Sequence, residues 1–154
     1  MWGGSEFLEG HDMKVSARNV FRGKISAVVN GAVNAEIELM TAGGDRIVAI
    51  VTEDSVKLLG LAVGQEALAY VKAPWVMVLT GESDVRFSAR NQLRGKVVAL
   101  VPGTVNTEVG IQLPGGTVVH AMLTNEAIAD MELKLGADAT ALIKASHVIL
   151  GVPS

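Results

Sequence analysis

An internal repeat constrains this chain more than any other feature of its sequence. The tetrapeptide SARN occurs at residues 16–19 and again, 72 positions later, at residues 88–91. With the same offset, the RGK of residues 22–24 falls on residues 94–96, and about a third of the aligned positions are identical without a gap. Such self-similarity indicates a tandem duplication in which each copy is one structural unit.

The repeat sets the expected domain boundaries. Residues 1–12 contain Gly-Ser-Glu-Phe, which resembles translated cloning sites, and we interpret them as an expression leader before a native start at Met13. We expect a first unit at residues 13–80 and a second unit at residues 87–154. The linker between them, GESDVR at residues 81–86, is short and polar.

The composition favours short strands and excludes several classes of partner. Apolar residues make up 49% of the chain but aromatic residues only 4%, so Val, Ile, Leu and Ala must build the core. The absence of cysteine excludes disulfides and thiolate metal sites and fits a cytoplasmic protein. A net charge of −3 provides no basic field for nucleic acid or a membrane surface. The sequence has no signal peptide and no apolar run long enough for a transmembrane helix. Together with the net charge, this leads us to expect neither membrane nor nucleic-acid partners.

Each copy has the pattern of five strands and one helix. The elements expected in the first copy are strands at 16–31, 33–40 and 46–52, a hairpin turn at 42–45, a helix from Thr52 to a stop at Gly60, and two strands within 66–79 that break near Ala73 and Pro74. Gly23 suggests a bulge or bend in the first strand. The predicted fold is all-β with a short helix per unit: two tandem OB-like five-stranded Greek-key barrels. Barrels this small have open edges, which we expect the sister unit or other chains to cover.

Catalytic groups are scarce. His11 lies in the leader, and His120 and His147 fall on Val48 and Trp75 of the first copy, so no histidine site is duplicated. The chain contains no Ser-His-Asp order, no dinucleotide-binding glycine motif and no P-loop. We therefore predict that the protein is not an enzyme, has no directly coordinated metal and needs no cofactor.

What recurs is a set of hydrogen-bond donors. SARN recurs together with Lys72-Ala73, which falls on 144–145, and with the loop at residues 31–34, which falls on 103–106. Small residues with free backbone N–H groups, hydroxyls and a lysine suit a small tetrahedral anion. The alternative is purely structural: SARN as a cap or turn, the lysine as a solvated strand end, and the loop as a turn. The recurring Glu36 and Glu108 are expected on a solvated strand face.

These motifs together resemble the Mop-type molybdate-binding domain. The resemblance rests on SARN, GAVNAE at 31–36, TxxS at 52–55, KAPWV at 72–76 and KASHVILG at 144–151, and it is closest to two-domain molbindins. It implies a cytoplasmic molybdate-binding protein for molybdenum storage and homeostasis, which also takes tungstate. It further implies a homotrimer that holds two classes of site at interfaces between domains.

The resemblance also assigns residues to each class of site. The first class comprises Ser16, Ala17, Arg18, Asn19, Ser55, Lys72, Ala73, Ser88, Ala89, Arg90, Asn91, Lys144, Ala145 and Ser146. The second class comprises the loop residues Gly31, Ala32, Val33, Asn34, Gly103, Thr104, Val105 and Asn106. The copies differ at Ser55, which becomes Ala127, at Ala32, which becomes Thr104, and at Pro74-Trp75, which becomes Ser146-His147. These departures leave open whether the sites of the two units are equivalent.

Two other functions remain to be weighed against a molybdate carrier. The same tandem domain forms the effector half of molybdate-responsive transcription regulators, so the chain could be such a sensing module without its DNA-binding domain. An OB fold can also bind single-stranded nucleic acid, but that use needs exposed aromatic residues and a basic groove. The net charge of −3 and the few aromatic side chains argue against it.

Overall fold

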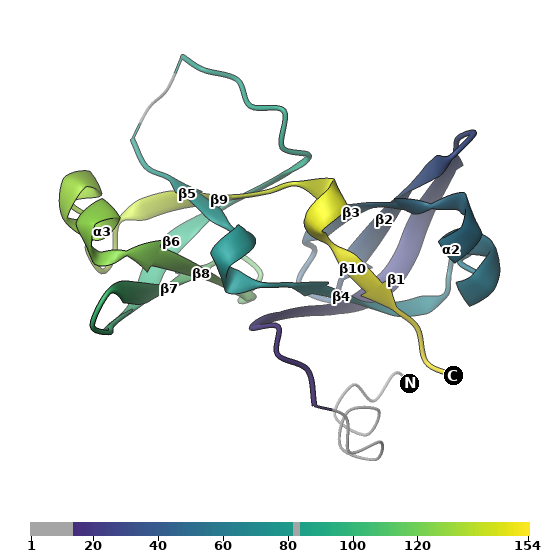
Figure 1. The fold of residues 1–154 in the computed structure, drawn as a ribbon, viewed down its shortest axis with the longest axis horizontal. Helices are drawn as coiled ribbons and strands as arrows, with labels where there is room; N and C mark the ends of the chain where they lie inside the picture. The colour runs from purple at the N-terminus through teal and green to yellow at the C-terminus, as the bar shows by residue number, and fades with distance from the viewer. Residues whose placement is uncertain (1–13, 82–83) are drawn as a thin grey trace.

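A computed structural model describes residues 14–81 and 84–154 of the chain. The proposed leader and Met13 lie outside the described residues, as does part of the linker. Two five-stranded antiparallel sheets lie side by side along the long axis of the molecule (Figure 1). None of the helices in the described ranges has the length and hydropathy that a bilayer span requires.

The observed elements follow the predicted order in both copies. In the first unit they are β1 (Asn19–Asn30), β2 (Asn34–Thr41), β3 (Arg46–Thr52), α2 (Glu53–Leu59), β4 (Glu66–Val71), the 3₁₀ turn η1 (Ala73–Trp75) and β5 (Met77–Leu79). In the second unit they are β6 (Asn91–Pro102), β7 (Asn106–Gln112), β8 (Val118–Thr124), α3 (Asn125–Met131), β9 (Asp138–Ile143), η2 (Ala145–His147) and β10 (Ile149–Gly151). The predicted fold class is confirmed, including the break at Ala73 and Pro74.

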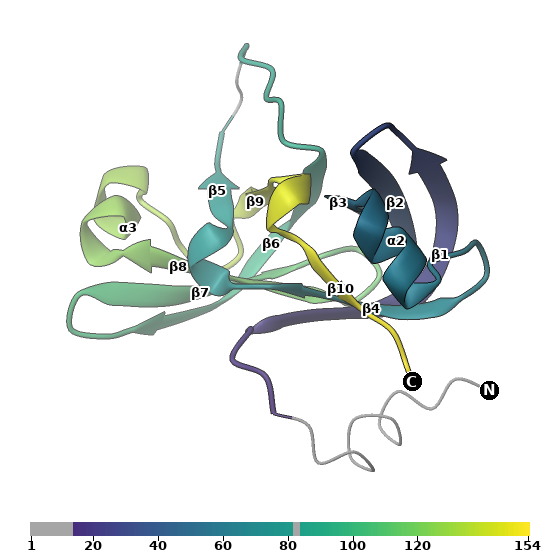
Figure 2. The same cartoon turned by 45° about the vertical axis from the view of Figure 1, so that its right-hand side comes forward.

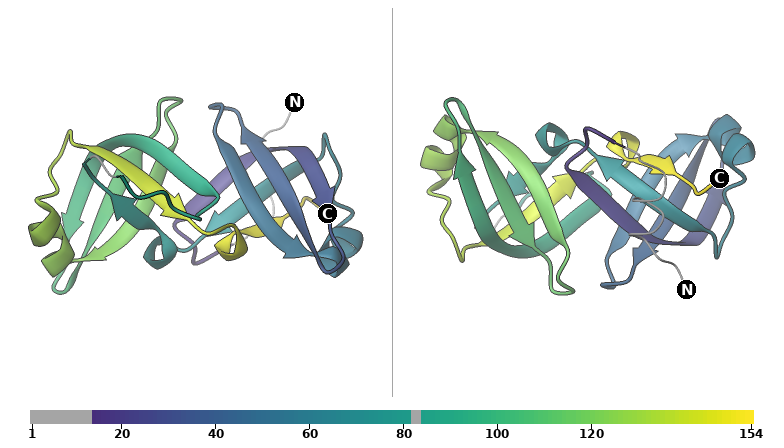
Figure 3. Two further views of the ribbon diagram at one scale, coloured as in Figure 1. Left: turned by 90° about the horizontal axis from the view of Figure 1, so that it is seen from above. Right: turned by 90° about the horizontal axis from the view of Figure 1, so that it is seen from below.

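The fifth strands are exchanged between the two sheets. The strand order is β10-β4-β1-β2-β3 in one sheet and β5-β9-β6-β7-β8 in the other. Leu150 of β10 therefore pairs with Ala69 of β4, and Val78 of β5 pairs with Ala141 of β9. Figure 3 shows the last strand of the chain reaching into the half that holds the first unit. The sister unit thus covers one open edge of each sheet, as expected, but it does so by supplying a strand.

The bulge in the first strand lies after the predicted position. The pairing of β1 with β2 shifts register between Ile25 and Ala27, and not at Gly23. Gly23 has another role, because a Cβ there would clash with the carbonyl group of Met40 on β2. Glycine is therefore required for the close approach of two strands rather than for a bulge.

The helices are capped as the sequence predicts. Thr52 accepts a hydrogen bond from the Ser55 N–H at the start of α2, and Gly60 ends this helix in the left-handed conformation with φ of 63°. Thr124 caps α3 in the same way. The residue that follows α3, however, is Glu132, a non-glycine residue that adopts the left-handed conformation with φ of 52°.

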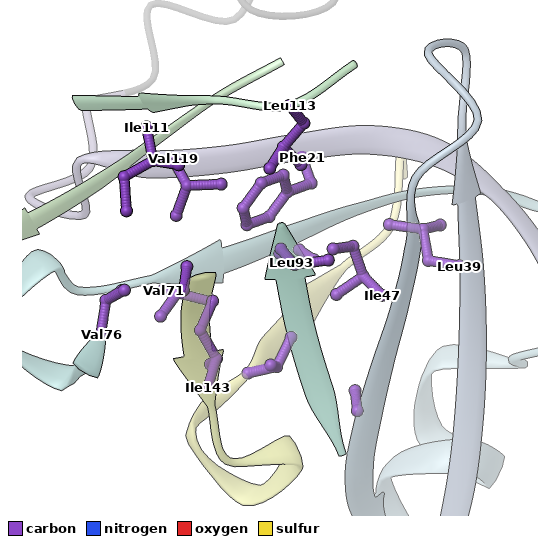
Figure 4. Packing of buried hydrophobic residues seen from close by; sticks show 14 of the residues in the cluster. Phe21, Leu39, Ile47, Val71, Val76, Leu93, Ile111, Leu113, Val119 and Ile143 are labelled. Carbon is purple, nitrogen blue, oxygen red and sulfur yellow. The ribbon is translucent and has the colours of Figure 1, made fainter. Parts of the chain in front are cut away.

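The two units share one continuous hydrophobic core. Phe21 of β1 lies beside Leu113 and Val119 of the second unit, and Leu93 of β6 lies near Ile47 of β3 (Figure 4). All five side chains are at most 9% exposed. Figure 2 shows η1 and η2 between the two halves, and Figure 1 shows α2 and α3 at opposite ends of the molecule. The seam between the units is therefore packed like an interior.

Candidate functional site

Strand pairing brings SARN and the recurring lysine together in each unit. Asn19, the last residue of the first SARN, pairs with Val71 at the end of β4, and Lys72 follows directly. In the second unit Asn91 pairs with Ile143 at the end of β9, next to Lys144. Because the strands are antiparallel, the start of one lies at the end of the other. Two motifs more than 50 positions apart in the sequence thus meet at one end of each sheet.

A pocket of about 370 Å³ lies where the second SARN meets Lys144. Its lining residues are Pro74, Trp75, Met77, Phe87, Ser88, Ala89, Leu142, Lys144 and His147. Ser88, Ala89 and Lys144 are predicted site residues of the second unit, whereas Trp75 comes from η1 of the first. The pocket therefore collects groups from both units, with one cation and one hydroxyl against an apolar wall.

Trp75 and His147 occupy equivalent positions of the repeat and meet at the seam. Their ring centroids are 5.0 Å apart with an interplanar angle of 33°. The Lys72 ammonium lies 5.7 Å from the centre of the Trp75 ring, within the range of a cation–π interaction. The Nδ1 atom of His147 is buried and has no hydrogen-bond partner among the described residues. The two 3₁₀ turns thus bring an aromatic ring and an imidazole together in the pocket that Lys144 also lines.

Both SARN arginines form ion pairs across the seam. The Arg18 Nε donates to Glu108 Oε1 at 2.6 Å, and the Arg90 guanidinium donates through two nitrogens to the Glu36 carboxylate. The two pairs are related by the repeat, since Glu36 and Glu108 are equivalent positions. The glutamates are partly exposed on their strands, and each also pairs with an arginine of the other unit, which the sequence did not indicate. Each guanidinium carries a carboxylate partner, which holds the start of one unit against the other.

Both SARN asparagines join the units through buried amides. Asn91 Oδ1 accepts from the Val48 N–H at 2.7 Å, and its Nδ2 donates to the Val48 carbonyl at 2.8 Å. Asn19 makes the same pair of bonds with the backbone of His120, at 2.7 and 2.8 Å. Each amide side chain thereby bonds the N–H and the carbonyl of one residue on the edge strand β3 or β8. Its own polar atoms are therefore engaged within the chain.

His120 introduces a titratable group on one side only. Its Nδ1 lies 3.6 Å from Glu108 Oε1, the carboxylate that also accepts from Arg18. Burial lowers the pKa of His120 below the ordinary value of 6.5, and the nearby Arg18 charge lowers it further, while Glu108 raises it. The equivalent residue in the first unit is Val48, so the other ion pair lacks this group.

The two GAVN loops lie at the other end of the long strands β1 and β6. All residues of 31–34 and 103–106 are exposed. The first helical residue of each unit anchors its loop, because the Glu53 N–H donates to the Val33 carbonyl and the Asn125 N–H to the Val105 carbonyl, both at 2.8 Å. β1 begins at the last residue of SARN and ends just before the loop, so the two motifs lie at opposite ends of a twelve-residue strand.

Ser55 lies with the loop and not with SARN. Its hydroxyl is 2.9 Å from the Thr52 hydroxyl at the start of α2. Thr52 pairs with Asn34, the last residue of the first GAVN loop. Within one chain the predicted first class is therefore divided: SARN and the lysine at one end of the sheet, Ser55 at the other.

Comparison with known proteins agrees with this division into two similar units. The sequence profile of the TOBE domain matches residues 15–78 and 88–150. The chain belongs to the TOBE domain family. The two matched segments coincide with the two copies of the repeat, and each contains one SARN, one GAVN-type loop and one lysine at the end of the fourth strand.

Relatives of these two TOBE units have names connected with molybdenum. The molybdenum-pterin-binding protein MopA of Rhodobacter capsulatus is 43% identical over 141 residues, which cover 92% of this chain and 53% of that protein. The molybdenum transport protein ModE of Herbaspirillum seropedicae is 40% identical over 145 residues, covering 94% of this chain and 54% of that protein. The chain thus spans about half the length of these curated relatives.

A solved structure matches over the whole TOBE pair. It is a crystal structure of the cytoplasmic molybdate-binding protein ModG with molybdate bound. The TM-score is 0.88 at 54% sequence identity, and the match covers 92% of this chain and 100% of that chain.

Proposed function

We propose that this protein binds molybdate, and the similar tungstate, as a cytoplasmic carrier or store of molybdenum. The observation that carries the proposal is the pocket that gathers Ser88, Ala89 and Lys144 at one end of the second TOBE unit. The likeness to ModG, whose crystal structure holds molybdate, supports the same conclusion. The first TOBE unit supplies the equivalent set at Ser16, Ala17 and Lys72.

The chemistry of the site suits a tetrahedral dianion. Each oxygen of molybdate accepts several hydrogen bonds, which a serine hydroxyl, backbone N–H groups and a lysine ammonium donate. The proposed roles are charge from Lys72 and Lys144, and shape from the backbone near Ala17, Ala73 and their copies. In this account Asn19, Asn91 and the two SARN arginines hold the site together across the seam, while contributing backbone rather than side-chain donors.

A binding role agrees better with these groups than a catalytic one. The polar side chains of the pocket are a lysine, a serine and a histidine, and the buried Nδ1 of His147 has no partner among the described residues. A nucleophile activated by a base needs a hydrogen bond between the two. Holding an oxyanion needs only donors, so we propose no catalysis and no resident cofactor.

The separation of Ser55 from SARN supports a role for more than one chain. The resemblance to molbindins groups Ser55 with SARN and the lysine, yet about one strand length separates them within a chain. If the α2 end of a second chain packs against the SARN end of the first, Ser55 of one chain lies beside SARN and the lysine of the other. We therefore propose a homotrimer with sites between chains, in which the ligand stabilises the assembly by mass action.

Calorimetric titration with molybdate, sulfate and phosphate tests the proposal. We expect heat with molybdate in the micromolar range and weaker binding of the two smaller anions. Lys144→Ala should weaken the SARN class of site by about tenfold to a hundredfold, because a hydrogen bond to a charged group contributes ~1.5–3 kcal/mol. Lys134→Ala removes the same charge from an exposed position outside the pocket and should change the affinity little. Absence of heat with molybdate refutes the proposal.

One observation favours a second candidate, the effector half of a regulator. The chain is 40% identical to ModE of Herbaspirillum seropedicae and covers only 54% of that protein. An immunoblot of the natural protein distinguishes the two functions. A product slightly smaller than this 16.1 kDa chain, without the leader, fits the carrier, and a product about twice as large, with a DNA-binding segment, fits the regulator.

A further inference from the structure

The first GAVN loop already holds an anion, the carboxylate of Glu53. The Gly31 N–H donates to Glu53 Oε2 at 2.9 Å. The side-chain amide of Asn30 lies 3.1 Å from both carboxylate oxygens and, with its nitrogen facing them, donates to both. The Glu53 backbone N–H is bound to the Val33 carbonyl at 2.8 Å, so the residue is fixed against the loop.

The second loop lacks this carboxylate and its partner. The residue equivalent to Glu53 is Asn125, and Asn30 is replaced by Pro102, which has no amide side chain. Asn125 donates through Nδ2 to the Gly103 carbonyl at 3.0 Å and accepts through Oδ1 from the Thr107 hydroxyl at 2.6 Å. The second loop is therefore held by a neutral side chain that faces a carbonyl rather than an N–H group.

We propose that Glu53 is a built-in competitor for oxyanions at the first GAVN loop. The inference rests on the proposed function, in which both loops form the second class of molybdate site. An oxyanion that accepts from the Gly31 N–H must take the place of Glu53 Oε2, because one N–H group serves one strong acceptor. The displaced carboxylate then remains close to a dianion and repels it.

The consequence is that the two loops of one chain bind molybdate unequally. In loop 103–106 the Gly103 N–H is bound to the Asn106 carbonyl at 2.7 Å, a neutral acceptor, and no carboxylate of the helix contacts it among the described residues, so this loop fills first. Loop 31–34 fills only when the ligand concentration is high enough to displace Glu53. A protein with this arrangement has a tight and a weak set of loop sites, which broadens the range of molybdate concentrations over which it takes up and releases the ion.

A reciprocal exchange of the two side chains tests the proposal. NMR titration with molybdate follows the amide signals of Gly31 and Gly103, so that each loop reports its own affinity. Glu53→Asn should tighten binding at Gly31 by about tenfold or more, and Asn125→Glu should weaken binding at Gly103 by a similar factor. Asp54→Asn, which removes an exposed neighbouring charge with no contact to the loop among the described residues, should change either affinity less than about threefold.

The outcomes separate this proposal from the proposed function. Equal affinities at Gly31 and Gly103 in the unchanged protein overturn the inference, as does an equal effect of Glu53→Asn and Asp54→Asn. If molybdate shifts signals near Ser88 and Lys144 but neither loop in any variant, the loops are not sites and only this inference fails. If molybdate shifts no signal in any of the four proteins, the proposed function fails as well.

Discussion

The two SARN asparagines form buried hydrogen bonds across the seam between the units. Each amide is about 2% exposed and forms hydrogen bonds to both backbone groups of one residue on the opposite unit. These hydrogen bonds join the edge strand of one sheet to the first strand of the other unit. Removing such an amide leaves a buried N–H and a buried carbonyl without partners.

Asn91→Ala should therefore lower the free energy of unfolding by about 2–4 kcal/mol, since two buried polar groups lose their hydrogen bonds. Urea denaturation followed by circular dichroism measures the change. The exposed amide of Asn30 provides a comparison, and Asn30→Ala should cost less than about 1 kcal/mol. Equal losses for the two variants would show that the seam does not depend on the buried amide.

His120 should make stability depend on pH. Its pKa in the folded protein lies below 6.5, so the unfolded chain takes up the proton first as the pH falls. The contribution of His120 is complete above pH 6.5 and decreases as the pH falls below that value. Because the side chain is partly exposed, we expect the loss to be small.

Replacement by the residue of the other unit isolates this effect. His120→Val copies Val48 and should remove the part of the pH dependence between pH 7.5 and 5.5 that His120 contributes. The measurement is the difference in unfolding free energy between the two pH values for both proteins. An unchanged difference would mean that His120 does not titrate differently in the folded and unfolded chain.

At the scale of single elements, the two short helices have the same start but different ends. Gly60 ends α2 with φ of 63°, whereas Glu132 ends α3 with φ of 52°. A residue with a Cβ adopts this left-handed conformation at a cost that glycine avoids.

Glu132→Gly should consequently stabilise the protein by about 0.5–1 kcal/mol, and Gly60→Ala should destabilise it by a similar amount. Thermal unfolding of both variants beside the unchanged protein measures the two effects. If both substitutions shift the midpoint in the same direction, backbone conformation at these positions does not explain the difference.

The elements themselves could be predicted from the sequence because their signals are local. Alternating apolar residues marked β2, a threonine and a glycine bracketed α2, and Pro74 marked the break before β5. The exchange of β5 and β10 could not be predicted, because a three-residue strand carries no information about which neighbouring edge it joins. Which edge β5 and β10 join depends on the direction in which η1 and η2 turn the chain. That direction depends on contacts between the two units, which the sequence does not show.

At the scale of the whole molecule, the exchange joins the two barrels into one folding unit. Each sheet contains a strand from the other half, and the core is continuous across the seam. Neither half can complete its own five-stranded sheet alone. The two barrels should therefore lose their structure together.

We expect a single unfolding transition that is the same by every probe. In a Trp2→Phe background, Trp75 is the only tryptophan of the chain and reports on the seam, while circular dichroism reports on both sheets. Coincident urea midpoints are predicted. Two separated transitions, with the Trp75 signal changing first, would show that the units fold independently and associate later.

The candidate site could be predicted in part. The repeat and the family resemblance led to SARN and the two lysines, and strand pairing places them together. The partners of the SARN arginines were missed, because Glu36 and Glu108 lie on strands that only the exchange and the shared core bring to the seam. The separation of Ser55 from SARN was also missed, because Ser55 was grouped with SARN on the family resemblance and not on the predicted pairing of residues 33–40 with 46–52.

The central claim is that the seam of these TOBE units holds molybdate through SARN and the lysine. Crystals of the protein grown with molybdate, measured for the anomalous signal of molybdenum, test it most directly. We expect strong anomalous density within hydrogen-bond distance of Ser88 and the Lys144 ammonium, and equivalent density at Ser16 and Lys72. Density absent from both positions, in crystals whose protein is otherwise well ordered, would contradict it.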